Sequence, residues 1–143
     1  MIIAVDFDGT IVEHKYPQIG KVIPFAFDTL KQLQNEHHIL ILWTVREGDL
    51  LQEAIDFCAK NGVTFFAHNA NFPEEDRSLA PRKLKADLFI DDRAFGGLPD
   101  WGFIYKMIRE KKHLRLKQID PMREEGEYSP KQKKSAWNKI FGK

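Results

Sequence analysis

Residues 2–10, IIAVDFDGT, join an unbroken apolar run to two aspartates, a glycine and a threonine. The apolar run is short and rich in β-branched side chains, which is typical of a buried strand. Asp6 then stands at the end of this strand and Asp8 in the following turn, where Gly9 and Thr10 let the backbone curl back. Two neighbouring carboxylates are costly to bury unless a cation or a proton offsets their charge. The stretch therefore predicts a strand that ends at a functional site.

Strand and helix patterns alternate along the chain after this first strand. The patterns predict helices over residues 24–35, 47–60 and 103–112, and further strands over 38–43, 63–67 and 88–90. Residues 13–23 are expected to form an excursion or small hairpin, and residues 68–82 a long polar loop. Continuous apolar strands joined by helices indicate a parallel sheet that is covered on both faces. We therefore expect a Rossmann-like, three-layer α/β/α fold with a short central parallel sheet.

Length and composition limit the class of protein. A chain of 143 residues is sufficient for one domain, and an apolar fraction of 43% is ordinary for a globular protein. The single cysteine, Cys58, allows no disulfide framework and favours a reducing compartment. No signal peptide and no apolar run of membrane-spanning length is visible. These features predict a cytoplasmic protein with no membrane partner.

The net charge of +1 hides an uneven distribution. Residues 1–105 contain 10 Lys or Arg against 16 Asp or Glu, whereas residues 106–143 contain 12 against 5. The basic residues are not interleaved with a recognisable binding motif, so no nucleic-acid partner is expected. Residues 131–143 (KQKKSAWNKIFGK) predict a short amphipathic helix that needs a surface on which to dock, on its own core or on a second subunit of a homo-oligomer.

Polar residues follow three of the four predicted strands. Asp6, Thr44 and Asp91 stand at these strand ends, and ligands of parallel sheets bind beyond the carboxyl ends of the strands. Four carboxylates, from Asp6, Asp8, Asp91 and Asp92, are therefore expected to converge there. A cluster of hard oxygen ligands without cysteine or histidine suits Mg²⁺ rather than zinc.

The same residues suit phosphoryl transfer. A metal-held Asp6 can attack phosphorus as a nucleophile, and Asp8 is close enough to give a proton to the leaving alcohol and later take one from water. The charge on the phosphate oxygens must also be offset. The expected phosphate contacts come from the hydroxyl of Thr44, the turn at Gly9 and Thr10, Arg46, Arg93, and either Lys83 or Lys85.

Four motifs in order resemble the phosphatases of the haloacid dehalogenase superfamily. They are DFDGT (6–10), ILILWT (39–44), a lysine before the fourth predicted strand, and LFIDD (88–92). The resemblance covers about residues 1–113, the expected phosphatase core, and leaves 114–143 as a basic tail. It implies that Asp6 is the nucleophile, Asp8 the acid and base, Thr44 and Lys83 catalytic phosphate ligands, and Asp91 the more direct metal ligand, supported by Asp92. Lys85 is the alternative to Lys83.

Core elements occupy most of the sequence between the motifs, so no cap domain is expected. The sequence predicts a capless, Mg²⁺-dependent phosphatase that hydrolyses a small phosphorylated metabolite through an aspartyl-phosphate. The alternative is a catalytically silent fold of the same kind that serves as a phosphate-binding or interaction module. A receiver-type phosphoacceptor module is rejected, because its acidic pair and its lysine occupy the reverse arrangement along the chain.

Overall fold

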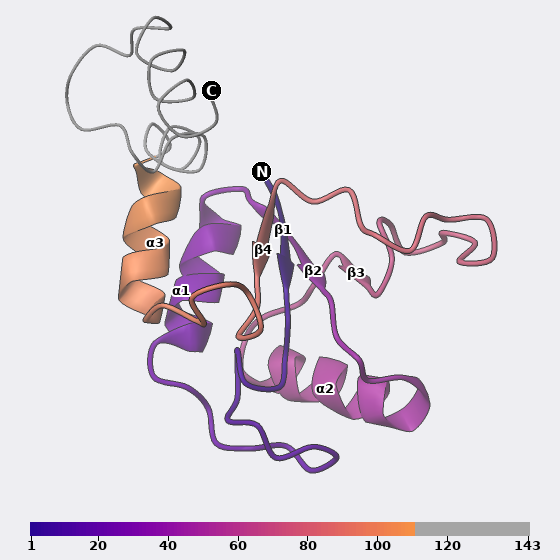
Figure 1. The fold of residues 1–143 in the computed structure, drawn as a ribbon, viewed down its shortest axis with the longest axis horizontal. Helices are drawn as coiled ribbons and strands as arrows, with labels where there is room; N and C mark the ends of the chain where they lie inside the picture. The colour runs from indigo at the N-terminus through magenta and orange to yellow at the C-terminus, as the bar shows by residue number, and fades with distance from the viewer. Residues whose placement is uncertain (111–143) are drawn as a thin grey trace, which may run out of the picture. The chain divides into compact units, whose positions relative to one another are not determined.

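A computed structural model describes residues 1–110, in which a sheet of four parallel strands is accompanied by three helices (Figure 1). The strands are β1 (Ile2–Val5), β2 (Ile39–Leu42), β3 (Ala67–His68) and β4 (Leu88–Ile90), in the spatial order β3-β2-β1-β4. The helices are α1 (Ala26–Asn35), α2 (Gly48–Lys60) and α3 (Trp101–Arg109). The α/β class and the parallel sheet are therefore confirmed. The predicted tail, 114–143, and its amphipathic helix lie outside the described residues.

Most predicted elements are present within a few residues of their expected bounds. The third strand is the exception, because it covers only Ala67 and His68 instead of residues 63–67. Residues 13–23 fold back as expected, since Val12 bridges Val22 in antiparallel fashion. None of the helices within residues 1–110 combines the length and apolar character needed to cross a membrane.

The register of the strands brings three chain segments to one edge of the sheet. Val5 of β1 lies opposite Leu42 of β2 and Ile90 of β4. The pairing continues beyond the strands, because the N–H of Asp6 donates to the carbonyl of Ile90 at 3.0 Å and that of Trp43 to the carbonyl of Val5 at 2.8 Å. The residues that follow β1, β2 and β4 therefore lie at the same edge.

The helices form one layer beside the sheet. The ring of Phe27 on α1 lies 6.0 Å from that of Phe57 on α2, and the hydroxyl of Thr29 on α1 donates to the carbonyl of Trp101 on α3 at 3.4 Å. α1 thus lies between α2 and α3, and Figure 1 shows α1 and α3 together on one side of the strands. Right-handed connections through α1 and α2 place both helices on the same face, because the sheet grows in one direction from β1 to β3.

On the opposite face of the sheet, residues 1–110 do not form the helical layer that a three-layer fold requires. The buried cluster on this face consists of Ala4, Ile41, Ala67 and Leu84, with Ile2, Trp43 and Ala86 packed against it. Leu84 and Ala86 belong to the irregular segment between β3 and β4, and no helix covers this face within residues 1–110. This segment is polar and contains Pro73 and Pro81, so it lacks the apolar periodicity that a covering helix requires.

Candidate active site

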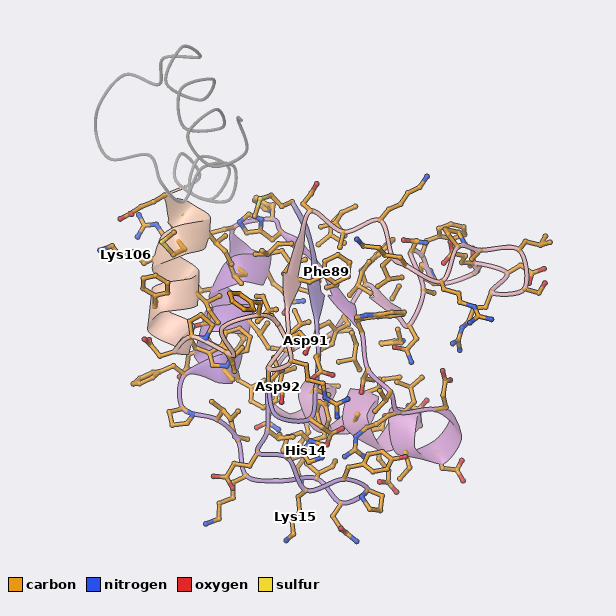
Figure 2. The ribbon with its side chains drawn as sticks, in the orientation of Figure 1. His14, Lys15, Phe89, Asp91, Asp92 and Lys106 are labelled. Atoms are coloured by element: carbon orange, nitrogen blue, oxygen red, sulfur yellow. The ribbon has the colours of Figure 1, made fainter. Side chains whose placement is uncertain are left out.

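Three carboxylates gather at the carboxyl edge of the sheet. Asp6 follows β1, while Asp91 and Asp92 follow β4, and one oxygen from each lies within 4.8 Å of the others. Figure 2 shows Asp91 and Asp92 just beyond the end of β4, with His14 on the segment below them in this view. The predicted convergence of carboxylates is thus present for three of the four residues.

The environment of Asp6 disfavours its ionised form. Burial, assisted by the charges of Asp91 and Asp92, raises the pKa of this carboxyl from 3.8 to about 6, against the lowering effect of hydrogen bonds from the backbone of Phe7 and the hydroxyl of Thr10. The hydroxyl of Thr10 donates to Oδ2 of Asp6 at 3.1 Å. At neutral pH the Asp6 carboxylate therefore carries a negative charge that a bound cation would stabilise.

The turn at Gly9 and Thr10 supports this acidic group. The hydroxyl of Thr10, which is buried, accepts from the N–H of Asp92 at 3.0 Å, so that one threonine joins Asp6 and Asp92. Gly9 has a φ of +88°, and a Cβ at this position would clash with the carboxylate of Asp92. The glycine is therefore needed for both its backbone conformation and its missing side chain.

The same turn corrects two predicted phosphate contacts. The N–H of Gly9 donates to the carbonyl of Val12 at 2.7 Å, and the N–H of Thr10 donates to the carbonyl of Phe7 at 3.3 Å. Both groups were expected to bind phosphate, but the tight turn uses them to satisfy its own carbonyls. Gly9 and Thr10 shape the site instead of lining it.

The acidic group is suited to a hard divalent cation. All of its ligand atoms are carboxylate oxygens, and Oδ1 of Asp92 is buried without a hydrogen-bond partner among the described residues. A buried, unpaired carboxylate oxygen is costly unless a cation or a proton occupies the space beside it. Oxygen-only coordination is the kind that Mg²⁺ and Ca²⁺ prefer. The residues present therefore fit the predicted Mg²⁺.

Asp8 lies apart from this group. Its carboxylate forms a bidentate ion pair with Arg46, in which Nε donates to Oδ2 and Nη2 to Oδ1, both at 2.7 Å. The two side chains are nearly inaccessible, with exposed fractions of 4% for Asp8 and 0% for Arg46. Arg46 therefore cannot bind phosphate from the cavity as predicted, and the side chain of Asp8 is not one of the three grouped carboxylates.

Thr44 is held by a residue whose role was not predicted. The buried Asn69, which follows β3, accepts from the N–H of Thr44 at 2.8 Å and donates to the carbonyl of Arg46 at 3.1 Å. Asn69 has a positive φ of 51°, a conformation that asparagine adopts more readily than most residues do. The sequence signal for this role, which is to hold Thr44, was an amide side chain immediately after β3.

A cavity of about 330 Å³ adjoins these residues. Its lining residues are Asp6, Asp8, His14, Trp43, Thr44, Val45, Asp91 and Arg93. Five predicted site residues are therefore brought together, from segments after β1, β2 and β4. Trp43 and Val45 were not predicted, because nothing local to their sequence indicates that they face this space.

No family model and no curated protein matches the chain. A solved structure of a conserved protein from Bacteroides thetaiotaomicron is similar, with 60% sequence identity and a TM-score of 0.75. The similarity covers 87% of this chain and 98% of that protein. The chain belongs to the family of this conserved Bacteroides protein.

In this family member, neither predicted lysine lines the cavity. Lys83 is exposed and its Nζ lies 5.9 Å from the centre of the Phe89 ring, on the sheet face opposite the helices. Lys85 is also exposed, and its backbone N–H donates to the side chain of Asn71 at 2.7 Å. The choice between the two lysines stays a prediction. Arg93, in contrast, lines the cavity and has no side-chain partner within residues 1–110.

Proposed function

We propose that this chain is a Mg²⁺-dependent phosphatase of the haloacid dehalogenase type, with no cap domain among the described residues. The observation that carries the proposal is the grouping of Asp6 with Asp91 and Asp92 on the wall of a cavity that also contains Thr44. The four ordered motifs of the sequence support it. The size of the cavity, about 330 Å³, favours a small phosphate monoester as substrate.

In the proposed first step, an oxygen of Asp6 forms a bond to phosphorus and the bond from phosphorus to the leaving alcohol oxygen breaks. Asp8, in its protonated form, gives its proton to that oxygen. In the second step, water attacks the phosphorus of the aspartyl-phosphate, Asp8 takes a proton from this water, and inorganic phosphate leaves Asp6. The bonds from Arg46 use one lone pair on each oxygen of Asp8, and a second lone pair on each oxygen is available for the proton.

The other residues of the cavity have supporting roles in the proposal. Asp6, Asp91 and Asp92 would hold Mg²⁺, which when bound offsets the negative charge of the phosphate and the carboxylates. Thr44 and Arg93 line the same cavity and would contact phosphate oxygens, the first through its hydroxyl and the second as a charged donor.

The test is hydrolysis of p-nitrophenyl phosphate and a panel of phosphorylated metabolites with Mg²⁺. Activity should stop in excess chelator and return with Mg²⁺. Asp6→Asn should lower kcat by at least ~10⁴-fold, because the carboxylate nucleophile is lost. Asp28→Asn is the matched control, since Asp28 is an exposed aspartate that pairs with Lys31 on α1. Near-normal turnover by Asp6→Asn, or in excess chelator, would reject the mechanism.

A phosphate-binding module without turnover is the second candidate. The ion pair that engages both oxygens of Asp8 favours it, because the proposed acid is held by a buried cation. In that case calorimetry would detect binding of Mg²⁺ and of phosphate, whereas no member of the panel would be hydrolysed.

A further inference from the structure

Arg46 occupies an unusual position next to the proposed site. Its side chain is fully buried, although arginine is among the residues that are rarely found fully buried unless paired. The guanidinium makes four hydrogen bonds: two to the carboxylate of Asp8, one from Nη1 to the carbonyl of Pro17 at 2.9 Å, and one from Nη2 to the carbonyl of Gln18 at 3.0 Å. It thereby joins the turn after β1 to residues 13–23, which contribute His14 to the cavity.

Aromatic rings complete this environment. Cζ of Arg46 lies 5.1 Å from the ring centre of Phe7 and 5.3 Å from that of Tyr16. Both distances are within the range of cation–π attraction. A planar guanidinium can combine this contact with a bidentate carboxylate pair, whereas an ammonium group is a point charge with no fork geometry. Lysine would therefore retain the charge at position 46 without the fixed orientation.

Residues 13–23 contribute to the cavity through His14. The chain around His14 is fixed at two places: the N–H of Glu13 donates to the carbonyl of Lys21 at 2.7 Å, and Arg46 binds the carbonyls of Pro17 and Gln18. One buried side chain therefore determines both the orientation of Asp8 and the position of the segment that carries His14.

We propose that Arg46 is a positioning residue, which holds the Asp8 carboxylate and residues 13–23 in one fixed arrangement around the cavity. This inference rests on the proposed phosphatase function for its catalytic consequence. Arg46 itself touches no substrate and exchanges no proton. Its loss misplaces the proton donor of the reaction, and a displacement of about 1 Å at such a group can cost about 10²-fold in rate.

The catalytic test compares Arg46→Lys and Arg46→Ala with Arg77→Ala. Arg77 is the matched control, because it also forms a bidentate pair, with Glu47 at 2.8 and 3.1 Å, but on the exposed surface. Arg46→Lys should lower kcat by about 10²-fold with a smaller change in KM. Free guanidinium, at concentrations that do not unfold the protein, should restore part of the activity of Arg46→Ala. Arg77→Ala should retain its activity and show no response to guanidinium.

Hydrogen exchange provides a second test that does not depend on turnover. Amide protons of residues 13–23 should exchange at least tenfold faster in Arg46→Lys than in wild type, while those of β1 should be unchanged. Wild-type kcat together with wild-type exchange in Arg46→Lys would overturn the inference. If the wild-type protein hydrolyses no phosphate monoester, the proposed function fails, and faster exchange confined to residues 13–23 would still support the positioning role. Unchanged exchange would overturn it in that case as well.

Discussion

Asp6→Asn should stabilise the metal-free protein at pH 8, although it removes the proposed nucleophile. The Asp6 carboxylate is mostly buried beside two other carboxylates, and its pKa is raised to about 6 as a result. At pH 8 the folded protein must therefore keep this group charged in an environment that disfavours the charge. Asparagine has a similar shape, and its amide oxygen can still accept the hydrogen bond that Thr10 donates to Asp6.

The magnitude follows from the difference between the pKa of 3.8 and the folded value of about 6. Because the folded pKa is the higher one, the folded state binds the proton more tightly than the unfolded state. The stabilising contribution of the protonated group is complete below pH 3.8 and is lost as the pH rises through 6. A shift of about two pKa units corresponds to at most roughly 3 kcal/mol in the free energy of unfolding.

The assay is urea unfolding in excess chelator, followed by tryptophan fluorescence at pH 4 and pH 8. Relative to wild type, Asp6→Asn should be more stable at pH 8 than it is at pH 4. The expected change in this relative free energy of unfolding is roughly 1–3 kcal/mol. Asp28→Asn should show no comparable change, because Asp28 is exposed on α1. An equal difference for Asp6→Asn at both pH values would refute the electrostatic reasoning.

Mg²⁺ extends this test to the metal site. A cation that binds the folded state stabilises the protein in proportion to the logarithm of its concentration above Kd. Wild type should therefore gain stability from Mg²⁺, and gain more at pH 8 than at pH 5, where a proton competes for Asp6. Asp6→Asn should gain much less. Equal stabilisation of the two proteins at pH 8 would place the cation elsewhere.

Two further predictions concern the turn and the lysines. Gly9→Ala and Gly96→Ala both place an L-residue at a positive φ, which costs about 1–2 kcal/mol in stability, but only at Gly9 does the new Cβ clash with a carboxylate of the acidic group. Gly9→Ala should therefore also lose the stabilisation by Mg²⁺ in thermal unfolding, and a Gly9→Ala protein with normal Mg²⁺ stabilisation would contradict the assigned role. If Lys83 binds the phosphate, Lys83→Ala should raise KM for phosphate monoesters about tenfold or more, whereas Lys85→Ala should be mild. The opposite ranking would assign the role to Lys85.

Local sequence was sufficient to predict most of the secondary structure and the location of the acidic group. Short apolar runs and helical periodicity depend only on neighbouring residues, and they predicted the positions of β1, β2, β4 and the three helices. The parallel arrangement then places the carboxyl ends of the strands at one edge. The sequence alone therefore predicts that Asp6 and Asp91 lie together, because strand direction brings them to this edge.

Tertiary packing decided the features that the sequence left open or indicated wrongly. Leu84 and Ala86, which belong to no helix, pack on the second sheet face, and the guanidinium of Arg46 turns inward to Asp8 across 38 positions of sequence. The N–H of Gly9 is used by its own turn. These outcomes depend on which polar groups become buried and therefore need hydrogen-bond partners. Those partners come from distant segments of the chain. The strands and their acidic ends follow from local pattern, whereas the partner of each buried charge is set only when the distant segments pack.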